Sequence, residues 1–368
     1  MKLLIERAAL LRVLSHSQSV VERRNTIPVL SNVMIEARND AVTLTATDLD
    51  LQITETVGAR VELGGRITVS AHTLFDIIRK MPDGCEIELA AGDAQLTITG
   101  GRARFRLAIL PAEDFPVIAT GELPTRFELD AEELGTLLGR VRYAISTEET
   151  RYYLNGIYLH TTDEKELLAV ATDGHRLARN GIPAPAGIEI DPGIIIPRKC
   201  VAELLKLVDE VDGDVSIELS QTKIRFLLGN AILTSKVIDG TFPQYQRVIP
   251  TTNDKIVTVD ATSLAQGIDR VATIATEKTR AVRVDLSSNK LTLIVESPEN
   301  GRAVEEVEAD YTGADLSIGF NARYFLEVLN HHKATSIEIS LADPAAPALL
   351  RPKTEGATEI GILMPMRV

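Results

Sequence analysis

The sequence predicts an α+β fold made of three repeated domains, each with two helices and several antiparallel strands. Two observations lead to this prediction. The same series of strands and helices occurs three times in the same order, at intervals of about 125 residues. The strands alternate apolar and polar residues, which is typical of antiparallel strands with one buried and one solvated face. Because a repeat of this length far exceeds one unit of a solenoid, it indicates whole domains, with helices on one face of each sheet.

A short strand that leads into an acidic helix start is the first repeated element. It occupies positions 4–6, 128–130 and 258–260. Each copy ends in an acidic residue, and apolar residues follow four and eight positions later, as Leu10 and Leu14 do in the first copy. An acidic residue at a helix N-cap accepts a bond from a free backbone N–H, and this apolar spacing gives one buried helix face. We therefore expect helices over 6–14, 130–143 and 260–274.

A strand that runs into a polar turn is the second repeated element. Apolar residues alternate along the strand, which ends in a threonine or serine that starts the turn. These residues are Thr47, Thr172 and Ser297, which are spaced by 125 positions and again by 125. The equal spacing supports the threefold repeat.

A second helix with a strand on each side completes each repeat. The expected helices span 72–81, 198–208 and 321–333, and each follows an apolar strand. The strands after them alternate strictly and lie at 86–89, 216–219 and 336–339. Polar, turn-rich connectors at 118–124 and 249–254 separate the repeats. The predicted domains are therefore 1–121, 122–250 and 251–368.

Composition is typical of a globular protein from a reducing compartment. Of the 368 residues, 45% are hydrophobic and 25% are charged, which is ordinary for a soluble protein. No apolar run reaches the roughly 20 residues that span a bilayer, and no signal peptide is evident. Cys85 and Cys200 form neither a disulfide framework nor a metal-binding pair. A cytoplasmic location is expected.

Five stretches along the chain together resemble one family. They are Arg151–Gly156, Ala171–Leu177, Asp239–Pro243, Ile318–Asn321 and Met364–Val368. In this order they resemble the bacterial DNA polymerase III beta subunits, the sliding clamps, and the resemblance extends over the whole chain. Val368 departs from the family pattern, in which the last residue is usually leucine.

The resemblance implies a non-catalytic protein that holds a DNA polymerase on its template. Two copies would join head to tail, so that six domains of the DNA-clamp fold form a closed ring with helices lining the hole and antiparallel sheets outside. The ring would encircle double-stranded DNA without reading its sequence and would give processivity to the replicative polymerase. The expected partners are the polymerase III alpha subunit, the clamp loader, and other polymerases and repair proteins that carry short peptide motifs.

Charge is compatible with such a ring. The net charge is −13, which argues against tight DNA binding over the whole surface, because that binding depends on lysine and arginine. The six expected helices carry a summed formal charge of +3, and the rest of the chain carries −16. A mildly positive bore attracts the phosphate backbone, and an acidic exterior repels stray DNA. Lysine and arginine also favour solvated helix faces in general, which explains part of the same bias.

Basic and aromatic residues are the candidate DNA contacts that the resemblance implies. They are Arg24, His72, Tyr152, Tyr153, Arg198 and Lys199. His72 stands where the family often has arginine. Aromatic faces can stack on exposed bases, so the tyrosine pair suits a loop that reaches towards DNA. A half-buried strand start is the alternative explanation for the two tyrosines.

The resemblance also implies a groove between the second and third domains that receives a short partner peptide. The matching positions are Leu154, Thr172, Gly174, His175, Arg176, Leu177, Pro243, Arg247, Val248, Asn321, Tyr324, Ile362, Met364, Pro365, Met366, Arg367 and Val368. Apolar side chains and methionines form an adaptable pocket, whereas Arg, His and Asn can hold the polar ends of a peptide. A last strand packed into the third domain is the alternative explanation for the apolar C-terminal run. Thr279 replaces an aromatic residue of some relatives, so one groove wall is expected to be less apolar.

A third set of residues is expected at the joint between two copies. By the resemblance, the first domain of one copy would face the third domain of the other. The residues are Arg104, Phe105 and Leu107 in the first domain, and Thr273, Ile274, Glu305 and Glu306 in the third. Ordinary strand core is the alternative explanation for Phe105 and Leu107.

An enzymatic function has little support in the sequence. Residues Asp173–Arg176 place a histidine beside a carboxylate, the minimum for general acid–base catalysis, but no serine or cysteine nucleophile signature accompanies them. His331 and His332 are neighbours on an expected helix and point about 100° apart, so they do not form a metal pair. No phosphate-binding loop or dinucleotide fingerprint is present, and we expect no cofactor and no metal. The alternatives to a clamp are a scaffold that binds partners without encircling DNA, and a hydrolase that uses residues 173–176.

Overall fold

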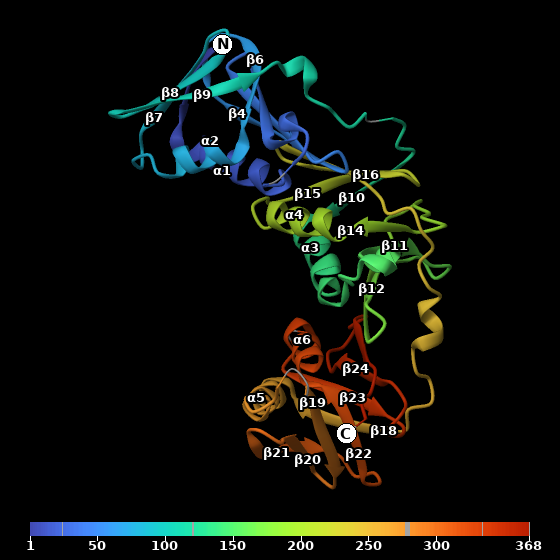
Figure 1. Cartoon of the computed structure of the whole chain (residues 1–368). Helices are drawn as coiled ribbons and strands as arrows, with labels where there is room; N and C mark the ends of the chain where they lie inside the picture. Colours follow the sequence, from blue (N-terminus) through green and yellow to red (C-terminus); the bar gives the residue numbers. More distant parts are fainter. Residues whose placement is uncertain (24, 120, 277–279, 333, 368) are drawn as a thin grey trace. The chain divides into compact units, whose positions relative to one another are not determined.

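The computed structural model describes residues 1–23, 25–119, 121–276, 280–332 and 334–367. Among these residues are six α-helices and 25 strands, and the strands form two antiparallel sheets. The α+β prediction is therefore confirmed. The chain divides into two compact units, one of residues 1–134 with 199–237 and the other of residues 135–198 with 238–368 (Figure 1).

One antiparallel sheet belongs wholly to the first unit. Its strand order is β10-β15-β16-β17-β4-β3-β2-β6-β9-β8-β7-β1-β5. Helices α1 (Arg7–Val20) and α2 (Ala71–Arg79) lie side by side, and α1 packs on β3 and β4 (Figure 1). The strands are β1 (Lys2–Glu6), β2 (Asn32–Arg38), β3 (Ala41–Thr47), β4 (Leu51–Gly58), β5 (Arg60–Leu63), β6 (Gly65–Ser70), β7 (Glu86–Ala91), β8 (Gln95–Gly100), β9 (Ala103–Leu110), β10 (Thr125–Asp130), β15 (Asp214–Leu219), β16 (Lys223–Leu228) and β17 (Ala231–Lys236).

The other sheet belongs wholly to the second unit. Its strand order is β14-β11-β12-β13-β25-β24-β23-β18-β21-β20-β19-β22. Helices α5 (Ala261–Ala272) and α6 (Ala322–His332) pack together, and α5 covers β20 and β21. The strands are β11 (Gly156–Thr161), β12 (Glu166–Thr172), β13 (Arg176–Pro183), β14 (Ile194–Pro197), β18 (Lys255–Asp260), β19 (Ala281–Ser287), β20 (Lys290–Ser297), β21 (Gly301–Asp310), β22 (Leu316–Asn321), β23 (Ser336–Leu341), β24 (Ala348–Pro352) and β25 (Ile360–Leu363). The remaining helices are α3 (Ala131–Gly139) and α4 (Arg198–Val208).

The apolar helix faces predicted from the repeat are confirmed. The positions four and eight residues after each acidic helix start are buried in all three helices: Leu10, Leu14, Leu134, Leu138, Leu264 and Ile268. The predicted helix lengths are less accurate. Helix α1 continues to Val20, because Val13 and Val20 extend its buried face, whereas α3 ends at Gly139 and a separate 3-10 turn follows at Arg142–Ala144.

The predicted acidic caps are confirmed in two of the three helices. The Asp260 carboxylate accepts the Ser263 amide at 2.7 Å, and the Asp130 carboxylate accepts the Glu132 amide at 2.9 Å. The Glu6 side chain makes no capping bond to α1, so this prediction is wrong. Glutamate has one more methylene group than aspartate, and it fits the short reach from an N-cap to the first turn less well.

The repeated threonine turn has the same hydrogen bonds in the first two repeats. The Thr47 hydroxyl donates to the Leu51 carbonyl oxygen at 2.9 Å and accepts the Leu49 amide at 3.0 Å. The Thr172 hydroxyl likewise donates to the Arg176 carbonyl oxygen at 2.7 Å and accepts the Gly174 amide at 3.1 Å. The Ser297 hydroxyl differs: it accepts the Asn300 amide, three residues later instead of two, at 3.2 Å, so the third turn does not repeat this pattern.

The strand after the second helix needs a correction of two residues. Ile5 pairs with Ile87, Leu129 pairs with Val215, and Val259 pairs with Ile337. Val215, rather than Ile217, is therefore the counterpart of Ile87 and Ile337. Side chains alternate with a period of two, so a slip of two residues keeps every side chain on its face and leaves the sequence pattern unchanged.

Two strand pairs join successive repeats, and we call them the inter-repeat joints. In the first unit β4 pairs with β17, with Leu51 opposite Ser235. In the second unit β13 pairs with β25, with Arg176 opposite Leu363. Leu51 and Arg176 are 125 positions apart, and Ser235 and Leu363 are 128 apart. The same two offsets convert each of the other three pairs of the second joint into a pair of the first. The two joints therefore have the same register.

Candidate functional site

The end of the chain is held between two other segments of the second unit. The Met364 amide donates to the His175 carbonyl oxygen at 2.9 Å, and the Met366 amide donates to the Gly319 carbonyl oxygen at 2.8 Å. The first bond continues the pairing of β25 with β13 beyond Leu363. The apolar C-terminal run is therefore a packed strand end, as the alternative explanation proposed, and its outward side chains contribute to a surface.

We call this surface the C-terminal patch and define it by His175, Val248, Tyr324, Met364 and Met366. The His175 and Tyr324 rings stack with centroids 6.2 Å apart. Val248, Met364 and Met366 are 47%, 40% and 39% exposed. Such large apolar exposure in one region is typical of a surface that a partner covers.

Most other residues of the predicted peptide groove lie at or under this patch. Leu154, Leu177 and Ile362 are buried in one apolar cluster with Phe242 and Tyr245, so they support the patch from below. The exposed or half-buried residues of the predicted groove are Thr172, Gly174, Pro243, Arg247, Asn321, Pro365 and Arg367. Val368 and Thr279 lie outside the described residues.

Arg176 is buried beneath the patch and connects its own turn with two other segments. Its Nε donates to Asp173 at 3.1 Å, its Nη2 donates to the Tyr143 carbonyl oxygen at 2.5 Å, and its Nη1 donates to Glu327 of α6. The guanidinium also lies over the Tyr324 ring, 4.4 Å from the centroid. Burial opposes ionisation of Glu327, but the bonds from Arg176 and Arg323 outweigh it and lower the pKa of Glu327.

Gly174 is required by the turn at the edge of the patch. Its φ is +87°, a conformation that L side chains rarely adopt, and a Cβ atom there would lie 2.5 Å from Nη1 of Arg151. Arg151 is held in turn by Glu148, with Nη2 to Oε1 at 2.7 Å. The counterpart in the first repeat, Leu49, has a similar φ of +80°.

Two candidate DNA contacts of the first unit cap the same helix end. The Lys199 ammonium donates to the Val20 carbonyl oxygen at 2.8 Å, and the His72 Nε2 donates to the Val21 carbonyl oxygen at 2.9 Å. These carbonyls end α1 and have no partner within the helix. Lys199 also binds the Asp48 carboxylate at 2.5 Å. Both side chains therefore have a role in the fold, and Arg24 lies outside the described residues.

The other candidate DNA contacts lie together in the second unit. Arg198 is exposed, and its amide donates to the Asn155 carbonyl oxygen at 2.9 Å. Asn155 ends the 3-10 segment Glu149–Leu154, which carries Tyr152 and Tyr153, with ring centroids 5.9 Å apart. Tyr152 is 54% exposed. The tyrosines are therefore on a 3-10 segment, and the alternative of a strand start is wrong.

The positive charge of the helices is smaller than predicted. With the observed helix bounds, the summed formal charge is +2. Several helix cations are also paired with carboxylates of the same helix, as in Arg79–Asp76, Lys206–Glu203 and Arg323–Glu327. Attraction of the DNA backbone by these helices is therefore weak.

The predicted joint residues of the first unit lie on an incompletely paired strand. Arg104, Phe105 and Leu107 are on β9, which pairs with β8 along its length and with β6 only at Ile109 and Leu110. Along 103–107 no strand among the described residues pairs with its other edge. Phe105 is 41% exposed, so the alternative that it belongs to the strand core is wrong.

The predicted joint residues of the second unit surround a similar strand. Glu305 and Glu306 are on β21, which pairs with β20 throughout and with β18 only at Ala309 and Asp310. Glu305 binds Arg270 of α5 at 2.9 Å, and Glu306 binds Lys290 at 2.6 Å. Thr273 and Ile274 follow α5, and the Asn300 side chain donates to the Ile274 carbonyl oxygen at 3.1 Å.

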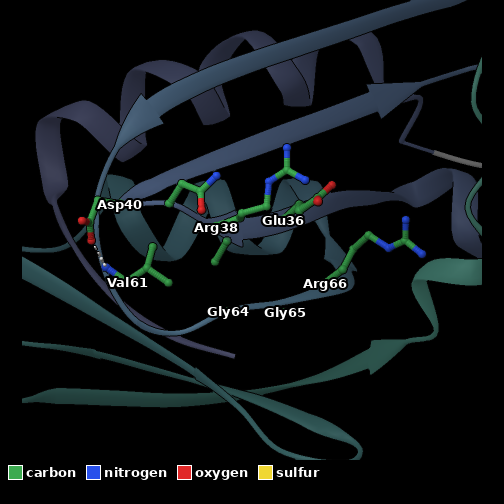
Figure 2. A pocket seen from close by; sticks show the side chains of 9 residues that line it. Glu36, Arg38, Asp40, Val61, Gly64, Gly65 and Arg66 are labelled. Atoms are coloured by element: carbon green, nitrogen blue, oxygen red, sulfur yellow. Dashed lines mark hydrogen bonds between the residues drawn. The ribbon is translucent and has the colours of Figure 1, made fainter.

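An open recess at the turn after β2 contains none of the predicted site residues. Figure 2 shows Asp40, whose carboxylate accepts the Val61 amide at 3.4 Å, at the opposite end of the view from Arg66. Glu36 and Arg38 complete the charged lining. Two carboxylates and two guanidinium groups balance one another, so the recess has no strong preference for an anion or a cation.

The 173–176 turn does not have the arrangement of a catalytic dyad. The Asp173 carboxylate accepts the amides of His175 and Arg176 at 2.9 and 3.0 Å and the Arg176 Nε, whereas the His175 ring stacks on Tyr324. In the described part of the chain, no group of three His, Cys, Asp or Glu side chains could hold a metal ion. None of its helices is long and apolar enough to cross a bilayer.

Sequence reasoning missed Glu327 and Tyr143, which hold Arg176 in place. Tyr143 lies about 30 residues before the turn and Glu327 about 150 residues after it, so no local pattern connects them. The position of Glu327 on α6, one helical turn after Tyr324, was the only available signal.

Comparisons with known proteins agree along the whole chain. Residues 1–119, 128–244 and 246–367 match family models of the N-terminal, central and C-terminal domains of the DNA polymerase III beta subunit. The chain is 50% identical to the beta sliding clamp of Caulobacter vibrioides and 34% identical to that of Escherichia coli, and each alignment covers 100% of both proteins.

Solved structures of similar proteins give the same result. A sliding clamp from Bartonella birtlesii, bound to griselimycin, superposes with a TM-score of 0.97 at 47% identity over 100% of both chains. A Caulobacter crescentus beta sliding clamp, with PEG bound to a putative beta-motif tethering region, superposes with a TM-score of 0.96 at 50% identity over 100% of this chain and 99% of the other.

Proposed function

The chain belongs to the family of bacterial DNA polymerase III beta subunits, the sliding clamps, and we propose that two copies of it close head to tail into a ring around double-stranded DNA. The protein is thus a DNA sliding clamp, a non-catalytic processivity factor of the polymerase. In the proposed ring each copy contributes three domains, 1–121, 122–250 and 251–368. The domains meet through two inter-repeat joints within each copy and two joints between the copies.

The free edges of β9 and β21 are the observation that carries the proposed ring. β9 is the counterpart of β17, and β21 is the counterpart of β4. β17 and β4 pair with each other in the first inter-repeat joint, whereas the same edges of β9 and β21 have no partner strand among the described residues. The edge of β9 in one copy can therefore pair with the edge of β21 in another copy, as β17 pairs with β4. Such head-to-tail contacts give a closed ring when the rotation from copy to copy returns to the first copy.

Burial at equivalent positions supports the same contact. Phe105 follows the β8–β9 turn at the same distance as Leu233 follows the β16–β17 turn. Leu233 is fully buried opposite Ile53, whereas Phe105 is 41% exposed. Transferred to β9 and β21, the register of the inter-repeat joints puts Phe105 opposite Ala303 and Ala103 opposite Glu305 of the other copy.

Retention on DNA tests the ring directly. We would load the protein onto nicked circular DNA with a clamp-loading complex and ATP, and then linearise the DNA. A topological ring is retained on the circle and is lost after cutting, because weak backbone contacts do not hold it. Equal retention on circular and linear DNA would show ordinary contact binding, which is expected of a scaffold that does not encircle DNA, and would contradict the ring.

The C-terminal patch is the proposed site for the polymerase and other partners. Its exposed methionines and valine suit apolar side chains of several short peptides, since methionine side chains adapt to different shapes. The polymerase III alpha subunit, the clamp loader, other polymerases and repair proteins are the proposed partners, and the cytoplasm is the proposed location.

Removal of Met364–Val368 tests this assignment. We expect the truncated chain to lose binding to purified polymerase III alpha subunit by at least about tenfold, a loss of about 1.4 kcal/mol, and to remain a dimer in light scattering. β25 ends at Leu363, so the truncation leaves the sheet intact. A truncated chain that binds the alpha subunit as tightly as the full chain would move the site elsewhere.

A further inference from the structure

The side chain of Arg176 is buried and bonded to the protein's own groups. Its three nitrogens donate to Asp173, Glu327 and the Tyr143 carbonyl oxygen, and its side chain is only 6% exposed. A partner peptide could reach this guanidinium only if the groups that cover it moved. Arg176 therefore belongs to the support of the C-terminal patch rather than to its contact surface.

The guanidinium fixes an aromatic ring that does reach the surface. It lies 4.4 Å from the centroid of Tyr324 and 5.3 Å from the centroid of Tyr143. A cation over an aromatic face is attracted by the ring's electron density, most strongly where water is excluded. The Tyr324 ring also stacks with the His175 ring. The position of the Tyr324 ring thus depends on where Arg176 is held.

Glu327 is the group of α6 that holds Arg176. It lies one helical turn after Tyr324, so the same helix carries both the ring and the carboxylate under it. A buried guanidinium costs free energy unless an anion pairs with it, and removal of one partner leaves an uncompensated charge. Without Glu327, the carboxylate of Asp173 would be the remaining anion that bonds to Arg176. This carboxylate already accepts hydrogen bonds from two backbone amides.

We propose that Glu327 is a positioning residue for partner binding: its ion pair with Arg176 fixes the Tyr324 ring in the orientation that a partner peptide contacts. This inference rests on the C-terminal patch as the partner site. Glu327 itself touches no partner. Its effect reaches the surface through Arg176 and then through the Tyr324 ring.

The chain contains a matched control for this role. Glu203 is the sixth residue of α4, as Glu327 is the sixth residue of α6. Glu203 accepts the Ser19 hydroxyl at 2.5 Å and Lys206 at 2.8 Å, and it belongs to the first unit, whereas the patch belongs to the second. Glu203→Gln therefore removes a buried carboxylate at the equivalent helix position without touching the patch.

Binding of immobilised polymerase III alpha subunit is the first measurement. We expect Glu327→Ala to weaken binding about tenfold, Glu327→Gln to weaken it about threefold because the amide oxygen still accepts a bond from Arg176, and Glu203→Gln to leave it within about twofold. Circular dichroism and melting temperature of each variant report whether it folds. Equal affinity of the native chain and Glu327→Ala would overturn the proposal.

A double-mutant cycle separates positioning from a general loss of stability. If Glu327 acts through the Tyr324 ring, Glu327→Ala costs less than about twofold in a Tyr324→Leu background, because the ring that it positions is absent. A loss of stability alone would act equally in both backgrounds. Additive losses of affinity would therefore contradict the proposed route.

A spectroscopic readout tests the ring position without any partner. The chain has no tryptophan, so Tyr324→Trp introduces a single indole over Arg176. We expect Glu327→Ala to shift its emission to longer wavelength, as the indole leaves its half-buried place, and Glu203→Gln to leave the emission unchanged. An emission wavelength that Glu327→Ala leaves unchanged would overturn the positioning role. If the native chain does not bind the alpha subunit, the proposed partner site itself would be contradicted, whatever the emission shows.

Discussion

One helix position shows how a single residue differs among the repeats. His16, Arg140 and Arg270 lie six residues after Leu10, Leu134 and Leu264, respectively. The two His16 ring nitrogens lie 2.8 Å from Glu55 and 3.1 Å from Glu210. Arg140 donates to the His331 carbonyl oxygen at 2.6 Å, and Arg270 binds Glu305. Two repeats therefore hold a permanent cation at this position, whereas the first holds a titratable one.

The His16 site makes the stability of the first unit dependent on pH. Burial disfavours the imidazolium, but the bonds and charges of Glu55 and Glu210 outweigh it and raise the pKa of His16. The folded pKa thus exceeds the unfolded value of about 6.5, so the stabilisation is complete below that pH and is lost as pH rises through the folded pKa. Arg12 also pairs with Glu55, at 2.9 Å.

Calorimetry of the native chain and His16→Gln checks this prediction. At pH 6 the native chain should have a higher melting temperature and a higher free energy of unfolding than the variant. This difference in free energy should be smaller at pH 9, by about 1.4 kcal/mol for each unit by which the folded pKa of His16 exceeds its unfolded value. His16→Arg, which copies the other two repeats, should remove the pH dependence. A difference between the native chain and His16→Gln that stays constant across this range would contradict the ion pair.

At the residue scale, sequence alone predicted what depends on a few neighbouring positions. The caps at Asp130 and Asp260 and the turns at Thr47 and Thr172 follow from side chains that bond within four residues. The support of Arg176 could not be predicted in this way, because its bonding groups come from distant segments of the second unit. Glu6 failed as a cap because residue type alone was taken as sufficient.

At the element scale, the end of α1 combines structural and candidate DNA-binding residues. Lys199 and His72 satisfy the carbonyls of Val20 and Val21, and the chain then continues to Arg23. A positive group at a helix C-terminus is favoured by the helix dipole as well. Lys199, paired also with Asp48, is thus a weaker candidate for a phosphate contact than Arg198, which is exposed at the start of α4.

Salt dependence of DNA binding separates these two adjacent cations. A side chain that neutralises one phosphate contributes about one unit to the slope of log affinity against log salt. We expect Arg198→Ala to reduce that slope by about one, and Lys199→Ala to change it by less than half as much while lowering the melting temperature. An equal effect of the two substitutions on the slope would show that the Asp48 ion pair opens on DNA.

The helices and strands were predictable because their burial patterns are strong and local, but their registers were not. The apolar faces of α1, α3 and α5 follow from leucines at a helical spacing. The two-residue slip in aligning β7, β15 and β23 arose because side-chain alternation cannot distinguish such a shift. The excess of positive charge on the helices was also overestimated by one unit, because the observed helix bounds differ from the predicted ones.

At the scale of the whole molecule, one joint is used repeatedly. The pairing of β4 with β17 recurs in β13 with β25, with the same offsets at every pair of the second joint. In the described part of the chain the three repeats form two such joints and leave one strand edge unpaired at each end, on β9 and on β21. Sequence periodicity indicated the three repeats, but only the sheet pairings identify the strands and residues by which a third joint would form.

The register of the proposed joint between copies can be tested by cross-linking. In the first joint the Lys236 amide bonds to Asp50 and the Thr56 amide bonds to Asn230, so Ala231 and Glu55 between them form a non-hydrogen-bonded pair. Such pairs have Cα atoms about 4.5 Å apart, within the range of a disulfide. The equivalent residues of β9 and β21 are Ala103 and Glu305.

A chain with Ala103→Cys and Glu305→Cys, in a Cys85→Ser background, should therefore oxidise to a covalent dimer of twice the 40.1 kDa chain mass in non-reducing gels. The matched control, Ala103→Cys with Ala303→Cys, is out of register by two residues. That pair would be separated by about 7–8 Å and should cross-link poorly. Preferential cross-linking of the control would shift the register by two residues. If neither variant cross-links, the proposed pairing of β9 with β21 would be contradicted, and the closed ring would lose the observation on which it is based.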